Sequence, residues 1–164
     1  MVIRDASIDD LAAIVAIYNA GIPGRMATAD LAPVSLESRR QWFDEHVPGS
    51  RPLWVVEEGG QIEGWLSLQA FHVRAAYHPT ADGQRLCRAG RSAKTLCART
   101  GGAGDRARRR IRNRHDARVH LRAQRAEPRA VPEFRFRETW GHLPRVAELD
   151  GIERDVLILG RRID

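Results

Sequence analysis

Apolar residues near the N-terminus recur three or four positions apart, a period that predicts a helix with one buried face. The stripe consists of Leu11, Ile14, Val15 and Tyr18. Ser7 precedes it as a candidate N-cap, and Gly21 is placed to end the helix. The segment before this helix, Val2-Ile3-Arg4, is expected to form a short first strand.

A second helix is predicted after a loop over residues 22–33, which is rich in glycine, proline and small side chains. Ser35 is a candidate N-cap for this helix. The helix would cover residues 36–46 and carry Trp42 and Phe43 on its apolar side. The chain is therefore expected to begin with one strand and two helices.

A β-hairpin is the clearest strand pattern in the chain. An apolar run over 52–56 and a returning strand over 61–68 flank a turn at 57–60 that ends in two glycines. The segment that follows, 69–80, is expected to be an irregular loop. It concentrates aromatic and basic side chains, namely Phe71, His72, Arg74, Tyr77 and His78.

Regular patterning returns near the C-terminus. Apolar residues over 138–143 and 145–149 are separated by Pro144, and Asp150-Gly151 is typical of a turn. The run over 154–160 predicts a final buried strand.

Charge divides the chain unevenly. Residues 82–137 hold 17 of the 27 basic residues and 5 of the 21 acidic ones, a formal charge of +12. The rest of the chain holds 10 basic and 16 acidic residues, a formal charge of −6. A basic protein usually suggests a nucleic-acid or anionic-surface partner, but here the positive charge belongs to one segment.

Targeting, membrane and metal signals are weak. No apolar run approaches the roughly 20 residues that a membrane span needs, and Met1–Asp5 has no apolar signal region. We therefore expect a cytoplasmic protein. Cys87 and Cys97 are too few for a structural zinc site, and we favour plain thiols over a disulfide. No metal site is predicted.

The order of predicted elements is strand, helix, helix, hairpin, an aromatic and basic loop, and a last strand. The segments that carry a family resemblance are Ile3–Ala6, Leu11–Asn19, Trp54–Glu57, Ile62–Ser67 and Trp140–Pro144. On these segments the chain resembles the GNAT N-acetyltransferases, specifically the branch that acetylates phosphinothricin and methionine sulfoximine. The resemblance implies one α/β (α+β) domain over 1–164, with a mixed central sheet flanked by helices. Only 1–81 and 138–164 are family-like.

The resemblance also implies a reaction. An enzyme of this family moves an acetyl group from acetyl-CoA, its co-substrate, to the amino group of a small amino-acid-like molecule. It holds the pyrophosphate on backbone N–H groups of a glycine-rich turn and polarises the thioester carbonyl with a strand N–H. The free α-amine has a pKa of about 8, so a nearby carboxylate or water chain would help as a base. The resemblance allows a homodimer.

Candidate site residues follow from the same resemblance. The substrate would lie along the 71–74 loop and against the stretch from Thr80 through Ala81 to Asp82. Asp82 occupies the position of the family's glutamate and is the candidate base. The loop residues would be Phe71 as an aromatic wall, His72 and Arg74 facing the substrate carboxylate, and Val73 between them.

Purely structural roles remain open for these residues. Phe71 could be a core aromatic, the 72–74 segment a solvated loop, and Thr80 the start of a strand. Four further residues could line the pocket but are expected chiefly to pack the helix or cap the loop: Tyr18, Asn19, Met26 and Thr28. Trp65 is expected in the core.

The middle of the chain departs from the family. After Thr80 the family continues with a strand of the type Ala-Glu-Val-Ser-Val-Tyr-Val, a glycine-rich loop and later a His-Asn strand end, and none of these is present. Gly101–Gly104 is glycine-rich, but no apolar helix pattern follows it. The residues that bind acetyl-CoA are therefore not assigned.

We hypothesise that a change of reading frame accounts for this departure. If the third base of the Asp82 codon is dropped, degenerate codons for 80–87 can be read as Thr-Ala-Glu-Val-Ser-Val-Tyr-Val. The same frame over 119–136 permits the missing His-Asn and Phe-Gly-Phe residues, and the written frame returns by Glu138. As written, 82–137 is expected to be poorly packed, or helical only in patches.

Two other readings stay open. The run Arg106–Arg114 would attract backbone phosphates, so the chain could be a nucleic-acid-binding module with a steep salt dependence. Aromatic stacking residues are absent there until Phe134, and no specific nucleic acid is expected. The chain could instead be a non-functional frameshifted product, which lacks a central strand and aggregates through an unpaired sheet edge.

Sequencing the gene across the codons for Thr80 to Trp140 tests the frame change. We expect a one-base discontinuity near the Asp82 codon and its compensation by Glu138. An uninterrupted frame through these codons would rule the hypothesis out.

Overall fold

The computed structural model describes residues 1–25, 27–89, 115–122 and 138–162. Within these residues, seven strands form one sheet in the order β1-β2-β3-β4-β5-β7-β6. The strands are β1 (Val2–Asp5), β2 (Leu53–Glu58), β3 (Gln61–Ala70), β4 (Thr80–Cys87), β5 (His115–Arg122), β6 (Glu138–Leu149) and β7 (Ile152–Arg162). β4 and β5 run parallel, and every other neighbouring pair is antiparallel.

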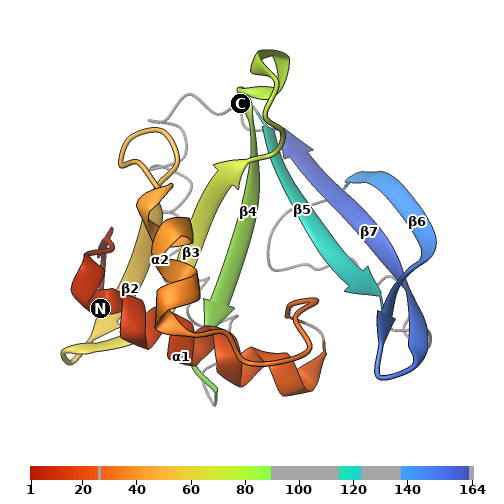
Figure 1. The fold of residues 1–164 in the computed structure, drawn as a ribbon. Helices are drawn as coiled ribbons and strands as arrows, with labels where there is room; N and C mark the ends of the chain where they lie inside the picture. The colour runs from red at the N-terminus through yellow and green to blue at the C-terminus, as the bar shows by residue number, and fades with distance from the viewer. Residues whose placement is uncertain (26, 90–114, 123–137, 163–164) are drawn as a thin grey trace.

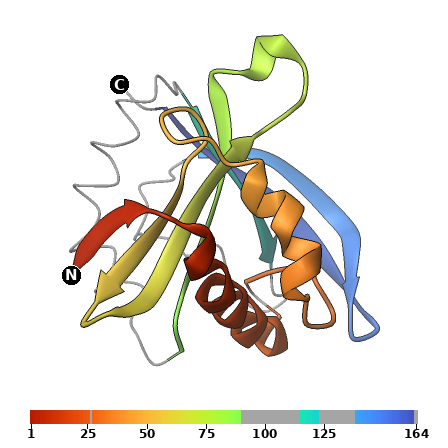
Figure 2. The ribbon, with the colours of Figure 1, turned by 60° about the vertical axis from the view of Figure 1, so that its left-hand side comes forward.

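Two helices, α1 (Leu11–Gly21) and α2 (Leu36–Asp44), cover one face of the N-terminal half of the sheet (Figure 1). Figure 2 shows the same two helices next to each other from a second side, beside β2 and β3. Three short 3-10 helices complete the described elements: η1 (Ile8–Asp10), η2 (Ile22–Gly24) and η3 (Ala75–Tyr77). In the described part of the chain, no helix is long and apolar enough to cross a membrane.

The main core lies between these helices and the sheet. Trp65 of β3 is 2% exposed, and its ring lies 6.4 Å from that of Tyr18 and 5.7 Å from that of Trp42. The other buried members are Ile14, Ile17, Ile22, Leu53, Val55, Ile62 and Leu86. The helical stripe and the hairpin predicted from the sequence thus supply the two sides of one core.

An ion-pair cluster joins the first strand to its surroundings. Arg4 donates to both oxygens of Asp10, at 2.6 and 2.9 Å, and its Nε donates to Glu57 at 2.9 Å. Asp10 also accepts a hydrogen bond from the backbone N–H of Ser7 at 2.8 Å. The Arg4 guanidinium is the main reason that the pKa of the buried Asp10 carboxyl lies below its ordinary value.

The hairpin turn is the one that the two glycines predict. Gly59 and Gly60 have φ angles of 59° and 78°. A two-residue turn with both φ angles positive matches the twist of the strands that it joins, and glycine adopts it without a steric cost. β3 then continues to Ala70, so it reaches further than the predicted strand over 61–68.

The prediction that 82–137 packs poorly is wrong for its first residues. β4 runs to Cys87 and pairs with β3 from Ala70↔Ala81 to Gly64↔Cys87. Leu86 is buried in the main core. The ladder uses main-chain groups, which every residue type except proline can supply in full, and Leu86 adds the apolar contact that holds the strand down.

The central strand expected to be missing is therefore present. β5, within the same basic segment, is also a strand. The remainder of that segment, including Cys97, Gly101–Gly104 and the run Arg106–Arg114, lies largely outside the described residues.

Two elements differ from the divisions in the sequence pattern. Residues 138–149, which Pro144 divides in the sequence, form one strand, because the register shift between Leu143 and Ala147 accommodates Pro144. Asp155 supports the shifted part: it accepts from the backbone N–H of Arg145 at 3.1 Å and lies 2.8 Å from His142 Nε2. α2 ends at Asp44 and not at residue 46.

Replacing Asp10 by Asn tests the Arg4 cluster. Because the folded-state pKa of Asp10 is lowered, its charge stabilises the fold above the unfolded pKa of about 3.9, and this contribution is lost as the pH falls through the lower folded value. We expect Asp10→Asn to lower the free energy of unfolding by about 1.5–3 kcal/mol at pH 7. Urea unfolding measured over a pH series should also show a weaker loss of stability at acid pH in this variant. Asp9→Asn, a change at the exposed neighbouring residue, is the control. It should change neither the free energy of unfolding at pH 7 nor its dependence on acid pH.

Candidate active site

The parallel pair β4–β5 separates almost as soon as it forms. Only Thr80, Ala81 and Asp82 have partners on β5, at His115, Asp116 and Ala117, although β5 pairs with β7 from His115 to Arg122. Figure 1 shows the two strands diverging from this short contact. In open sheets, ligands bind beyond the carboxyl ends of parallel strands, where the sheet divides.

Asp82 faces the helices. Successive strand side chains point to opposite faces, so Asp82 shares its face of β4 with Gln84 and Leu86. Leu86 packs into the core beneath α1, and this identifies that face as the helix side. Asp82 is half-buried on the same side, at the last paired position before the strands part.

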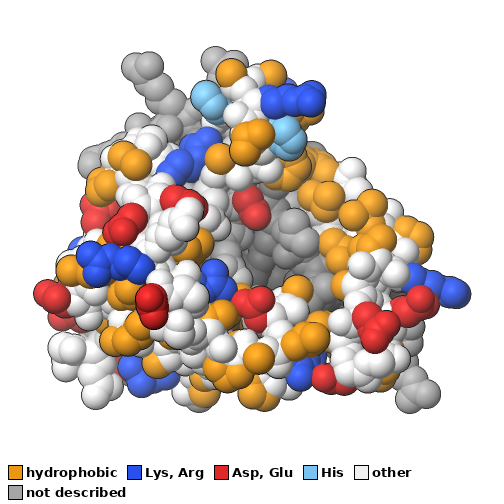
Figure 3. Space-filling view, viewed as in Figure 1, with side chains coloured by type: hydrophobic (Ala, Val, Ile, Leu, Met, Phe, Trp, Pro, Cys, Tyr) orange, Lys and Arg blue, Asp and Glu red, His pale blue; other side chains and the backbone are white. Residues whose placement is uncertain are grey.

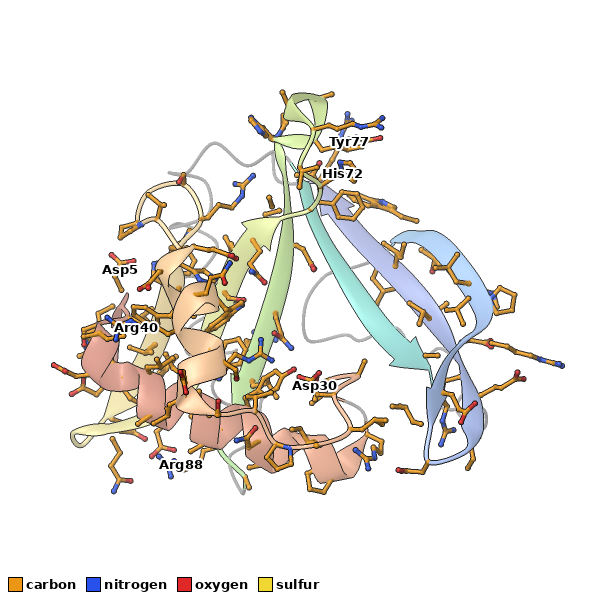
Figure 4. All side chains as sticks on the ribbon, in the orientation of Figure 1. Asp5, Asp30, Arg40, His72, Tyr77 and Arg88 are labelled. Atoms are coloured by element: carbon orange, nitrogen blue, oxygen red, sulfur yellow. The ribbon has the colours of Figure 1, made fainter. Side chains whose placement is uncertain are left out.

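The molecule is hollowed at its centre on this side (Figure 3). In the stick view, His72 and Tyr77 lie above the divergence of β4 and β5, and Asp30 lies below it (Figure 4). The opening is thus bordered by the loop between β3 and β4 at one end and by the loop between α1 and α2 at the other.

The loop between β3 and β4 is held by its own side chains. The rings of Phe71 and His72 lie 6.2 and 5.0 Å from the ring of Tyr77. His72 Nδ1 accepts a hydrogen bond from the backbone N–H of Arg74 at 3.2 Å. These contacts leave the Arg74 side chain exposed, and Val73 is 88% exposed.

The loop between α1 and α2 is fixed by a buried hydroxyl. Tyr18 Oη lies 2.5 Å from both Thr28 Oγ1 and Asp30 Oδ2. Burial, followed by the hydrogen bond to Asp30, raises the pKa of Tyr18 above its ordinary value. The Asn19 side chain also donates to the carbonyl of Val34 at 3.0 Å and accepts from the backbone N–H of Val34 at 2.9 Å.

A second ion pair ties the same loop to the far end of the sheet. Arg25 donates through Nε and Nη2 to the two carboxylate oxygens of Asp150, at 2.8 and 2.9 Å. Asp150 lies in the turn between β6 and β7. The guanidinium of Arg25 lowers the pKa of Asp150. This ion pair joins the loop after α1 to the hairpin of β6 and β7.

A small cavity of about 10 Å³, room for about one water molecule, lies between the helices and the sheet. Arg39 forms part of its wall: its guanidinium lies 4.3 Å from the centre of the Tyr18 ring and donates to Asp30 at 3.1 Å. The lining residues are Ile14, Val15, Tyr18, Arg39, Trp42, Trp65 and Gln84.

The predicted residues fall into two groups. Thr80 and Asp82 lie on the helix side of β4 at the divergence, and the loop with Phe71, His72 and Arg74 borders the opening. Ala81 is fully buried and points to the opposite face, so only its backbone is available to a ligand on the helix side. Met26 lies outside the described residues.

Sequence reasoning missed Asp30, Arg39 and Gln84. Arg39 carried a usable signal: it precedes Trp42 by three positions and Phe43 by four, which places a charged residue on the apolar side of α2. No sequence signal marked Asp30, because its contact with Arg39 depends on the path of the loop between α1 and α2.

Similar proteins agree with this geometry. YwnH of Bacillus subtilis (strain 168), whose assignment as a phosphinothricin acetyltransferase is provisional, is 35% identical over 169 residues that cover 99% of both chains. An L-methionine sulfoximine/L-methionine sulfone acetyltransferase of Pseudomonas aeruginosa is 36% identical over 66 residues, 40% of this chain and 38% of that protein. No family model matches the chain.

Solved structures show the same fold. A crystal structure with a provisional assignment as a phosphinothricin N-acetyltransferase has a TM-score of 0.88 at 32% identity, covering 99% of this chain and 98% of that one. A GNAT superfamily phosphinothricin acetyltransferase from Sinorhizobium meliloti, solved in complex with acetyl-CoA, has a TM-score of 0.83 at 21% identity, covering 99% and 88% of the two chains.

The divided sheet and these neighbours define a GNAT acyltransferase fold of mixed α/β class. The similarity along almost the whole sequence is more specific than the fold. This chain belongs to the phosphinothricin acetyltransferase branch of the GNAT N-acetyltransferases. The comparisons give no support to the nucleic-acid-binding alternative.

Proposed function

We propose that this protein transfers the acetyl group of acetyl-CoA to the amino group of a small amino acid of the phosphinothricin or methionine sulfoximine type. The observation that carries the proposal is the divergence of β4 from β5 directly after Asp82. It places a half-buried carboxylate at the mouth of an opening bordered by an aromatic and basic loop.

Asp82 acts as the base in this proposal. The substrate arrives as an ammonium ion with a pKa of about 8, and it must lose a proton before nitrogen can attack a carbonyl carbon. Asp82 accepts that proton, directly or through one water. Thr80 lies two residues earlier on the same face of β4 and is placed to donate a hydrogen bond to the substrate.

The loop between β3 and β4 orients the amino acid. Arg74 and His72 bind its carboxylate, and Phe71, which packs on Tyr77, forms an apolar wall. Val73 and the backbone of Ala81 complete this side. The backbone hydrogen bond that His72 Nδ1 accepts from Arg74 holds the two basic side chains on one short turn.

The space beside β4 fits the acyl donor. Within the described residues, the edge of β4 that faces β5 has no strand partner beyond Asp82. Acetyl-CoA, when bound, supplies the activated acetyl group. A β4 backbone N–H would polarise the acetyl carbonyl.

We further propose a cytoplasmic homodimer. β6 is an edge strand of the sheet, and large apolar side chains are exposed on β6 and β7. They are Trp140, Leu143, Val146 and Ile152. Grouped exposure of this kind is typical of a surface that a partner covers.

Replacing Asp82 by Asn tests the base. Loss of a positioned base typically lowers kcat by about 10²–10⁴, and we expect Asp82→Asn to fall in that range at pH 7. The defect should shrink well above pH 8, because the free amine then forms without help. A pH profile of kcat, compared with that of the surface change Asp44→Asn, checks both points. Equal activity of the two variants at pH 7 would remove Asp82 from the mechanism.

Replacing Arg74 by Ala tests substrate orientation. A hydrogen bond to a charged group contributes about 1.5–3 kcal/mol, so KM for the amino acid should rise by about 10–100-fold. KM for acetyl-CoA should stay unchanged, since the loop borders the amine side. Arg40→Ala, at an exposed position of α2, is the matched control. A rise in KM for acetyl-CoA alone would contradict the assignment.

A further inference from the structure

The loop between β3 and β4 protrudes from the end of the sheet (Figure 2). Residues 72–78 are all exposed, and the ring contacts of Phe71, His72 and Tyr77 join the loop to itself. A segment with few buried contacts opens easily, because little free energy opposes its movement. Residues that orient a substrate nevertheless need a fixed geometry. The position of this loop therefore depends on how its base is held.

The base of the loop is held by Arg51, which lies just before β2. Arg51 Nη2 donates to the carbonyl of His78 at 2.7 Å and makes a longer contact of 3.5 Å with the carbonyl of Thr80. His78 follows the short helix η3, and Thr80 is the first residue of β4. The Thr80 carbonyl also accepts from the backbone N–H of Phe71 at 3.5 Å. One oxygen thus joins the two ends of the loop to Arg51.

Arg51 is itself fixed by a tight turn. Its backbone N–H donates to the carbonyl of Val47 at 2.9 Å, and its carbonyl accepts from the N–H of Val47 at 3.0 Å. Gly49 has a φ angle of 86°, a left-handed conformation that glycine adopts without steric cost. The next residue, Pro52, is buried, and its carbonyl accepts from the N–H of Leu68 on β3 at 3.0 Å. The Arg51 side chain therefore reaches the loop from a backbone that is attached to the sheet.

A guanidinium suits this contact, because its planar fork of N–H donors can bond more than one carbonyl at once. In addition to its contacts with the loop, Arg51 donates through Nη1 to the carbonyl of Ser50 at 2.9 Å. The Arg51 side chain is half-buried, and burial lowers its pKa, but arginine keeps its charge near neutral pH. The hydrogen bonds to the loop are therefore charge-assisted and shielded in part from water.

We propose that Arg51 is a positioning residue of the amino-acid site, an inference that rests on the proposed function. Through the carbonyls of His78 and Thr80 it holds the loop where Arg74 and His72 face the substrate carboxylate. Arg51 acts through the loop and does not touch the substrate. The turn before β2 thereby sets the affinity for the amino acid, although it contributes no group to the reaction.

Replacing Arg51 by Gln tests this role. The turn is made by the backbone of Arg51, so the variant keeps the turn and loses the fork of charged donors. KM should rise by about tenfold for the better substrate of methionine sulfone and phosphinothricin, because a charge-assisted contact is lost. The kcat at saturation and the KM for acetyl-CoA should stay unchanged. Arg51→Lys keeps one charged donor and should give an intermediate KM.

Arg40→Gln, at an exposed position of α2, is the matched control and should keep the wild-type constants. A wild-type KM for the amino acid in Arg51→Gln would overturn the proposal. An equal rise in KM for the amino acid and for acetyl-CoA would also overturn it, because that result indicates a general loss of structure.

A double variant separates positioning from direct contact with the substrate. If Arg51 acts through Arg74, adding Arg51→Gln to Arg74→Ala should raise KM by no more than about threefold further, because the main group that Arg51 positions is already absent. A full tenfold rise on top of Arg74→Ala would show that Arg51 acts independently of that side chain and would count against the proposal.

Hydrogen exchange of the full chain separates this inference from the proposed function, because it needs no turnover. Arg51→Gln should speed exchange in the peptide over 71–80 about tenfold within the first seconds and leave the peptide over α1 unchanged. If the wild type acetylates neither amino acid but exchange in the loop rises, the acetyl-transfer proposal fails and the role of Arg51 in holding the loop stands. If the wild type acetylates one of them and Arg51→Gln changes neither exchange nor KM, the role of Arg51 fails and the enzyme assignment stands.

Discussion

The short parallel contact between β4 and β5 is the constraint on which the rest of the structure depends. A sheet that continued this pairing would bury the backbone of β4 between two neighbours and leave no room for a ligand. The contact ends at Asp82, while β3 and β7 keep each of the two strands paired on its other side. The opening is therefore supported on both sides by complete ladders, so the sheet divides without losing the order of either half.

On the helix side of this opening, α2 is stabilised by tertiary packing and not by intrinsic helix propensity. α2 has a largely polar sequence and no fully buried residue, so it depends on the contacts of Trp42 and Phe43 with the core. Trp65 lies at the centre of those contacts. The aromatic residues that anchor the helices therefore also form the walls of the cavity.

The sequence was most informative where local chemistry decides the structure. Gly59-Gly60 allowed only a tight hairpin, and the spacing of Leu11, Ile14 and Tyr18 defined the buried side of α1. It was least informative where tertiary contacts override composition. β4 looked unlike a central strand, yet main-chain pairing and one buried leucine were enough to make it one.

The candidate site shows the same division. The loop between β3 and β4 could be selected from its unusual residue types alone, whereas the pairing of Asp30 with Arg39 could not. That pair depends on how Tyr18 and Asn19 direct the loop between α1 and α2. The sequence pattern does not show the path of this loop, so it could not predict that Asp30 and Arg39 lie together.

The bond between Arg25 and Asp150 has a consequence for the order of assembly. It spans 125 positions of the chain, and contacts of such long sequence separation are costly in loop-closure entropy and slow to form. During synthesis on the ribosome, the segment after α1 emerges long before its partner in the last hairpin exists. The Arg25 side chain therefore gains its partner only after the last hairpin has formed, so a nascent or truncated chain would hold this loop through Tyr18 and Asn19 alone.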